Sequence, residues 1–99
     1  MGLHVSRHEP RSGHRWRTVR NEFKSRCKAA NAECWIGHHP IRYDVEGLPD
    51  SFELDHYQPV STHPHLVYDP SNFRPSCKRC NRTRGATPVA QGQWVSANW

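Results

Sequence analysis

Cysteine and histidine residues in two parts of the chain are spaced as metal ligands. Cys77 and Cys80 form a C-x-x-C pair, a spacing that allows both thiolates to reach one Zn²⁺ ion. Earlier in the chain, Cys34 is followed by His38 and His39, and Cys34-x3-His38 can supply the remaining ligands of a tetrahedral site. The sequence therefore predicts a structural Zn²⁺ bound by Cys34, His38, Cys77 and Cys80.

The identity of the fourth ligand is open because the turn after Cys34 is unusual. A second C-x-x-C pair would place a cysteine at position 37, where the chain has Gly37. His38 is one residue further along, and an imidazole reaches farther than a thiol, so the longer side chain can absorb the shift. His39 and Cys27 are the alternatives, and Cys27 would require the first helix to end against the metal.

A second set of residues has the chemistry of a hydrolytic site: Asp55, His56, Asn72 and Asn81. Asp and Asn offer hard oxygen ligands of the kind that Mg²⁺ and Mn²⁺ prefer, and a neutral imidazole is a suitable general base near neutral pH. Each residue alone is a weak signal, since an Asp-His dipeptide is mostly accidental and Asn72 precedes Phe-Arg-Pro, a turn-forming context.

The first element that the sequence predicts is an amphipathic helix from Arg15 to Ala30. Its apolar residues recur at i, i+3, i+7 and i+11, and they are Trp16, Val19, Phe23 and Cys27. This spacing gives one narrow apolar stripe. We interpret the stripe as packing surface that places the helix across the rest of the domain.

Two short strands are predicted next, at residues 41–43 and 52–56, joined by a loop that contains Gly47 and Pro49. Phe52 and Leu54 alternate with acidic residues, the period-two pattern of a half-buried strand. Three prolines then interrupt regular structure, which predicts a long ordered loop at 57–71.

A last short helix is expected to begin at Pro75-Ser76, with Ser76 as its N-cap and Gly85 as its end. Asn81 follows Cys80 directly on this helix, so the zinc site and the hydrolytic site would use adjacent helix faces. The zinc would then hold the helix against the strand that ends at position 56.

Taken together, these residues resemble the HNH endonuclease family. The segment F-E-L-D-H-Y-Q-P-V-S, followed by N-F-R-P-S-C-x-x-C-N-R-T-R-G, is similar to the versions carried by tailed bacteriophages, and the resemblance covers roughly residues 16–86. It implies an α+β fold, namely a small ββα-metal (HNH) motif with a treble-clef-like zinc site and an added N-terminal helix. It also implies a metal-dependent DNA endonuclease that nicks or cuts with low sequence specificity.

The resemblance assigns a role to each residue of the second set. Phosphodiester hydrolysis needs an activated water, charge neutralisation at phosphorus and help for the leaving 3′ oxygen. His56 is the implied general base, and Asp55 and Asn81 are the implied ligands of one Mg²⁺ or Mn²⁺. Asn72 is implied to orient the His56 ring without binding metal. Many family members have His at the last position, so Asn81 makes the site rich in oxygen and favours Mg²⁺ or Mn²⁺.

A net charge of +5 and a pI near 9.4 favour a polyanionic partner. Five basic residues on or beside the last helix are expected to contact DNA phosphates, and they are Arg74, Lys78, Arg79, Arg82 and Arg84. Double-stranded DNA is the expected substrate, and the phage resemblance implies the terminase large subunit as a partner during DNA packaging. The alternative function is a zinc-stapled DNA-binding module without catalysis, which would not require Asp55, His56 and Asn81 together.

The length of 99 residues allows one domain. We expect a flexible basic arm at 1–13, the nuclease domain at 14–86 and a tail at 87–99. The mean hydropathy of −0.94 leaves little apolar area to bury, so a metal is expected to add stability. Neither an apolar run of about 18 residues nor a signal peptide is visible, so we expect the cytoplasm, which is the bacterial host's if the chain is phage-encoded.

Overall fold

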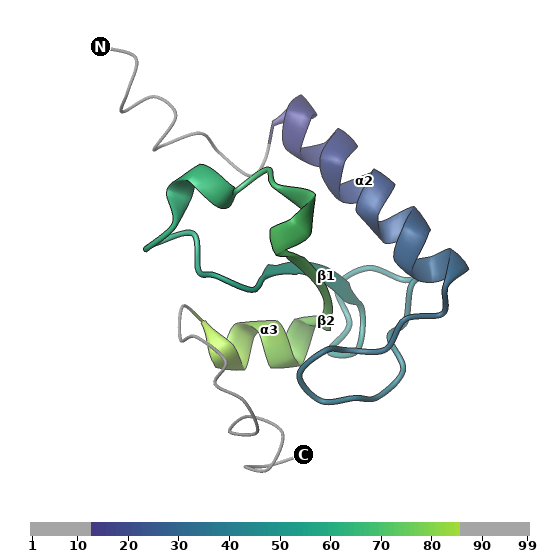
Figure 1. Cartoon of the computed structure of the whole chain (residues 1–99). Helices are drawn as coiled ribbons and strands as arrows, with labels where there is room; N and C mark the ends of the chain where they lie inside the picture. Colours follow the sequence, from purple (N-terminus) through teal and green to yellow (C-terminus); the bar gives the residue numbers. More distant parts are fainter. Residues whose placement is uncertain (1–12, 86–99) are drawn as a thin grey trace.

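The computed structural model of the chain describes residues 13–85. The basic arm and the C-terminal tail predicted from the sequence lie outside these residues, except for Gly13. Figure 1 shows an antiparallel pair of strands with one helix on either side. In chain order, the elements are α2 (His14–Ala29), β1 (Phe52–His56), two short 3-10 helices (Pro64–Leu66 and Pro70–Asn72), β2 (Phe73–Cys77) and α3 (Lys78–Arg84).

The long helix α2 confirms the predicted amphipathic stripe. Trp16, Phe23 and Cys27 are buried, and Val19 packs against the same core. The helix ends where Asn31 adopts a left-handed backbone conformation with φ 53°, a common way to terminate a helix. One face of α2 therefore covers the hairpin, as the sequence indicated.

Aromatic side chains from α2 and both strands form the centre of the core. The Phe23 ring lies 5.3 Å from the Phe73 ring and 6.1 Å from the Phe52 ring, and Trp16 contacts Phe73 edge-on at 6.5 Å. These distances are typical of favourable aromatic pairs. They fix α2 to the hairpin at two points along the helix.

The hairpin differs from the prediction in its second strand. The strand at 52–56 is confirmed, but residues 41–43 contribute only an isolated bridge between Arg42 and Ser51. The partner of β1 is β2, with Asp55 opposite Arg74 and His56 opposite Phe73. The expectation of a strand at 41–43 was therefore wrong.

A proline is tolerated inside β2 because of where its backbone points. Pro75 lies opposite Leu54, and its carbonyl accepts a hydrogen bond from the Trp35 backbone N–H on the other side, at 2.9 Å. The backbone nitrogen of Pro75 points the same way, away from β1, so no ladder hydrogen bond is lost. Sequence reasoning treated this proline as a helix start, which was wrong.

The last helix, α3, begins one residue later than predicted, since its N-cap is position 77 and not 76. Its N-cap is Cys77, whose sulfur accepts a hydrogen bond from the Cys80 N–H at 3.2 Å. Ser76 still belongs to β2 and donates to the Cys77 carbonyl, so it does not cap the helix. Gly85 ends α3 with φ 58°, as predicted, because glycine adopts a positive φ without a steric penalty.

No helix within residues 13–85 is long and apolar enough to cross a membrane.

Candidate functional site

Three cysteines and one histidine form a compact cluster between the Cys34 turn and the start of α3. The ligand atoms of Cys34, His39, Cys77 and Cys80 all lie within 4.8 Å of one another, and the three cysteines are buried. Three thiols and one imidazole are a typical donor set for structural zinc. The cluster could therefore hold a metal ion, and it joins two segments that are far apart in the sequence.

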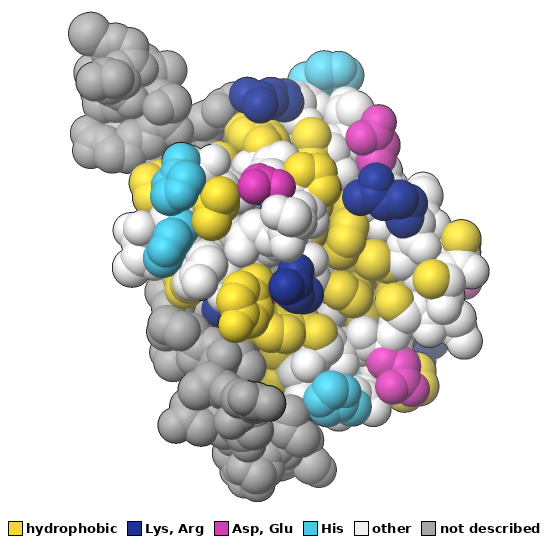
Figure 2. Space-filling view, viewed as in Figure 1, with side chains coloured by type: hydrophobic (Ala, Val, Ile, Leu, Met, Phe, Trp, Pro, Cys, Tyr) yellow, Lys and Arg dark blue, Asp and Glu magenta, His cyan; other side chains and the backbone are white. Residues whose placement is uncertain are grey.

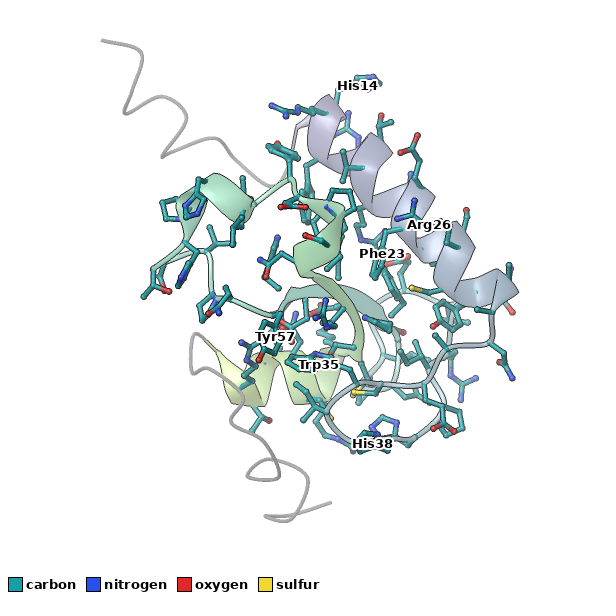
Figure 3. All side chains as sticks on the ribbon, viewed as in Figure 1. His14, Phe23, Arg26, Trp35, His38 and Tyr57 are labelled. Carbon is teal, nitrogen blue, oxygen red and sulfur yellow. The ribbon has the colours of Figure 1, made fainter. Side chains whose placement is uncertain are left out.

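The histidine of this cluster is His39, so the expectation of His38 was wrong. His39 Nε2 lies 3.5 Å from Cys77 Sγ and 3.6 Å from Cys80 Sγ. His38 is exposed and has φ 54°, and it lies at the periphery of the turn (Figure 3). Its backbone N–H donates to the Cys34 carbonyl at 2.8 Å, which tightens the turn so that the next residue reaches the sulfurs.

The His39 ring is also held in the tautomer that a metal requires. Its Nδ1 lies 3.0 Å from the Pro40 carbonyl oxygen, which can only accept a hydrogen bond, so Nδ1 carries the proton. Nε2 then presents its lone pair to the sulfurs, as in zinc sites with a carbonyl in the outer shell. Cys27, the other alternative, lies on the buried face of α2 and packs into the core, and burial raises its pKa.

The thiols of the cluster differ in their electrostatic environment. Burial alone would raise the pKa of Cys34, but backbone N–H groups, including that of Gly37, donate to its sulfur and bring the pKa below its usual value. Burial and the neighbouring Cys77 and Cys34 sulfurs raise the pKa of Cys80. Thiolates at this spacing repel one another, and a divalent cation would remove that repulsion.

Gly37 leaves the space that the His39 ring occupies. A Cβ atom at position 37 would lie 2.6 Å from His39 Cδ2 and 2.8 Å from His39 Nε2, closer than two such atoms can approach. We expect Gly37→Ala to displace the imidazole and weaken zinc binding by about 10–100-fold, the range seen when the support of a metal ligand is lost. Competition with a colorimetric chelator measures this change.

The matched control for that substitution is Gly13→Ala, because a Cβ at Gly13 meets nothing within 4 Å. The control should bind zinc as the wild type does. Equal zinc affinity in the Gly37 and Gly13 variants would show that the imidazole does not need this space.

A second site lies beside α3, where three predicted residues line one pocket. The pocket has a volume of about 210 Å³, and its lining includes Asp55, His56 and Asn81. Its other walls come from the beginning of the long loop and the end of α3. The structure thus brings the predicted general base and both predicted cation ligands to one cavity.

Asp55 is held by three hydrogen bonds that orient its carboxylate. Oδ2 accepts from Trp35 Nε1 at 2.9 Å and from Arg84 Nη1 at 2.8 Å, and Oδ1 accepts from the His56 backbone N–H at 2.8 Å. Trp35 directly follows Cys34, and Arg84 lies on α3, four residues after Cys80. Each half of the Cys–His cluster therefore has a neighbour in the sequence that donates to the same carboxylate oxygen.

Sequence reasoning missed Trp35 as part of the site. Its position beside Cys34 was the available signal, but the contact depends on how the turn meets β1. Arg84 was misassigned to DNA binding, since its side chain is only 1% exposed and also donates to the His56 and Tyr57 carbonyls. A guanidinium held this way lies inside the protein and does not face DNA, so that expectation was wrong.

His56 is buried between aromatic rings. Trp16 of α2 stacks on it at 5.9 Å and Phe73 meets it edge-on at 5.6 Å. Its Nε2 lies 3.0 Å from the Val67 carbonyl oxygen, so this nitrogen donates and carries the proton. In the neutral ring, Nδ1 is then the nitrogen that can act as a base.

Asn72 has the contacts expected of a residue that orients the loop after His56. Its Oδ1 accepts from the Gln58 N–H at 2.8 Å, and its Nδ2 donates to the Gln58 carbonyl at 3.1 Å. The Asn72 carbonyl also accepts from the Tyr57 N–H. Both ends of the amide are used within the protein, which agrees with a positioning role and not with metal binding.

Asn81 uses its amide nitrogen to hold Glu53. Asn81 Nδ2 donates to Glu53 Oε1 at 2.8 Å, and the other Glu53 oxygen pairs with Arg82 at 3.1 Å. This arrangement assigns the nitrogen end of the amide and leaves the carbonyl oxygen as the end that can bind a cation. Glu53, which sequence reasoning did not select, thereby fixes the orientation of the Asn81 side chain.

The other basic residues expected to contact DNA lie at or near the surface. Arg79 and Arg82 are exposed, and Lys78 and Arg74 are half-buried. The Arg74 guanidinium lies 4.9 Å from the centre of the Tyr57 ring, and Figure 3 shows Tyr57 near Trp35. On the face drawn in Figure 2, the Lys and Arg side chains stand apart, with apolar surface between them.

Comparison with known proteins gives one family and one relative. The family model described as HNH endonuclease matches residues 24–87. The Septu protein PtuB of Bacillus thuringiensis is 48% identical over 33 residues, which cover 33% of this chain and 13% of that protein. No solved structure matches the chain.

Proposed function

The chain belongs to the HNH endonuclease family, and on that premise we propose that it hydrolyses phosphodiester bonds in DNA with the help of one divalent cation. The observation that carries the proposal is the single pocket lined by Asp55, His56 and Asn81. A DNA-binding module without catalysis would not need a base and two oxygen ligands around one cavity. Membership of this nuclease family follows from the family match alone.

The residues of the pocket fit a hard divalent cation such as Mg²⁺ or Mn²⁺. Asp55 Oδ1 accepts one backbone hydrogen bond, so it retains lone-pair capacity, and Asn81 offers its carbonyl oxygen. Such a cation supplies neutralisation of charge on the phosphate and on the leaving oxygen. Two protein ligands leave the remaining coordination positions to water and substrate, which is usual for Mg²⁺.

His56 supplies the base in this proposal. Nδ1 takes a proton from a water whose oxygen attacks phosphorus, and the bond from phosphorus to the 3′ oxygen breaks on the opposite side. The Val67 carbonyl accepts from Nε2–H, so it stabilises the imidazolium that forms. The Trp16 ring stacked on His56 shields one face from water and favours a cationic ring.

Arg84 and Trp35 act through Asp55. Both donate to Oδ2, which directs Oδ1 to the remaining ligand role and neutralises part of the carboxylate charge. Trp35 directly follows Cys34, and Arg84 lies one helical turn after Cys80. We therefore propose that a structural Zn²⁺, bound by Cys34, His39, Cys77 and Cys80, holds both donors in place. The zinc thus acts on the hydrolytic site by positioning it.

The proposed activity is tested by incubating purified protein with supercoiled plasmid. We expect conversion to nicked or linear DNA when Mg²⁺ or Mn²⁺ is added, and none in buffer freed of divalent cations. Chelation of trace metal should be brief and weak, so that zinc content, measured in parallel, is unchanged. Full conversion without an added cation would contradict the proposed cation site.

Two predictions rest on the resemblance to phage proteins alone. They are low sequence specificity and an interaction with the terminase large subunit during phage DNA packaging. The matched relative shares only a short segment with this chain, so nothing about its partners transfers. Arg79 and Arg82 are the exposed residues of α3 that we propose for contact with DNA phosphates.

A further inference from the structure

A groove continues from the hydrolytic pocket along α3. A larger hollow of about 490 Å³ shares Leu54 and Asn81 with the pocket of about 210 Å³. A third hollow of about 260 Å³ shares Lys78 and Arg82 with the larger one. The three hollows therefore adjoin one another in a row, with the hydrolytic residues at one end.

Basic side chains from two helices line this groove. Lys78 and Arg82 come from α3, and Arg20 comes from α2 on the opposite wall. Arg20 lies before residue 24, where the family match begins, and its guanidinium lies 5.3 Å from the centre of the Phe52 ring at the base of the hollow. The groove is thus built partly by a residue outside the matched motif.

Carboxylates hold two of these three cations in place: Glu53 pairs with Arg82 at 3.1 Å, and Glu46 pairs with Arg20. Arg20 Nη2 and Lys24 Nζ pair with Glu46 at 3.1 and 2.7 Å, and the Glu46 side chain is 63% exposed. The hydrogen bond from Lys24 is the main cause that lowers the pKa of Glu46. Exposed ion pairs of this kind contribute little net stability, so another anion can replace Glu46 as the partner of Arg20 at small cost.

We propose that the groove lined by Arg20, Lys78 and Arg82 binds backbone phosphates of the DNA strand next to the bond being cut. Phosphates recur about every 3.4 Å of helix axis along one strand, so a strand with one phosphate in the pocket places its neighbours in the adjoining hollows. Arg20 contacts such a phosphate from α2 in place of Glu46. This inference rests on the proposed nuclease function and names how that site holds its substrate.

The test compares Arg20→Gln with Arg26→Gln in DNA binding without divalent cations, so that no cleavage occurs. Arg26 is exposed on the same helix (Figure 3), and it does not line the groove. Affinity for a short duplex is measured at several salt concentrations. Arg20→Gln should weaken binding by roughly fivefold to tenfold at 0.1 M salt and lower the salt slope by about 1, the effect of losing one phosphate contact.

A third variant probes the competing carboxylate. Glu46→Gln should strengthen DNA binding, because it removes the anion that a phosphate must replace. The control Arg26→Gln should change the salt slope by less than half as much as Arg20→Gln does. If Arg20→Gln has the affinity and slope of the Arg26 control, the groove proposal is overturned, even when the protein cleaves DNA. If binding depends on Arg20 but no cleavage occurs with any cation, the groove stands and the nuclease proposal fails.

Discussion

His56→Ala should lower the rate of plasmid cleavage by about 10²–10⁴-fold, the usual cost of removing a general base. The ring is held by the Val67 carbonyl and by Trp16, and among residues 13–85 no other histidine lines the pocket. Initial rates at saturating Mg²⁺ give the comparison. DNA affinity should stay within about twofold, because the buried His56 is not expected to contact phosphates.

Two further variants separate the loss of the base from a loss of fold. His65→Ala removes an exposed imidazole from the long loop and should cleave at the wild-type rate. His56→Gln fills the buried space without a base and should be as inactive as His56→Ala. A His56→Gln protein that cleaves within a factor of two of the wild type would place the base elsewhere.

The second large effect is expected at the Cys–His cluster, where His39→Asn should release zinc and His38→Asn should not. Asparagine suits both positions in the comparison, because it tolerates the left-handed backbone at His38. Structural zinc contributes directly to the free energy of folding, and a loss of only about 2 kcal/mol lowers the Tm of a domain this size by roughly 8–16 °C. Metal analysis and thermal unfolding measure the two effects.

Loss of zinc should also weaken the hydrolytic site, because Trp35 directly follows Cys34, Arg84 lies one helical turn after Cys80, and both hold Asp55. We expect His39→Asn to need more Mn²⁺ for half-maximal activity than His38→Asn does. Zinc lost from His38→Asn but kept by His39→Asn would mean that the turn in solution presents the other histidine.

Elements that carry their own pattern were predictable from the sequence. The apolar spacing from Trp16 to Cys27 located α2, and the alternation at Phe52 and Leu54 located β1. The C-x-x-C pair and the end of α3 at Gly85 were also recognisable. In each case, the spacing of the residues along the chain indicates the local structure directly, without knowledge of the tertiary contacts.

Features that depend on the tertiary path of the chain were not predictable. A proline usually interrupts a strand. Pro75 fits within β2 because its backbone nitrogen faces away from β1. His38 and His39 are chemically identical, so the choice between them depends on the backbone conformation of the turn. Arg84 is a basic residue at the end of α3, as a residue that contacts DNA would be. Only its burial against Asp55 shows that its side chain faces the protein interior.

The chemistry of the cut ends tests the central claim most directly. Attack of water with departure of the 3′ oxygen leaves a 5′-phosphate and a 3′-hydroxyl at each nick. Nicked circles made by the wild-type protein with Mg²⁺ should therefore be sealed by DNA ligase without any end repair. Nicks that resist sealing until a 3′-phosphate is removed, or the absence of any cation-dependent nick, would contradict the account.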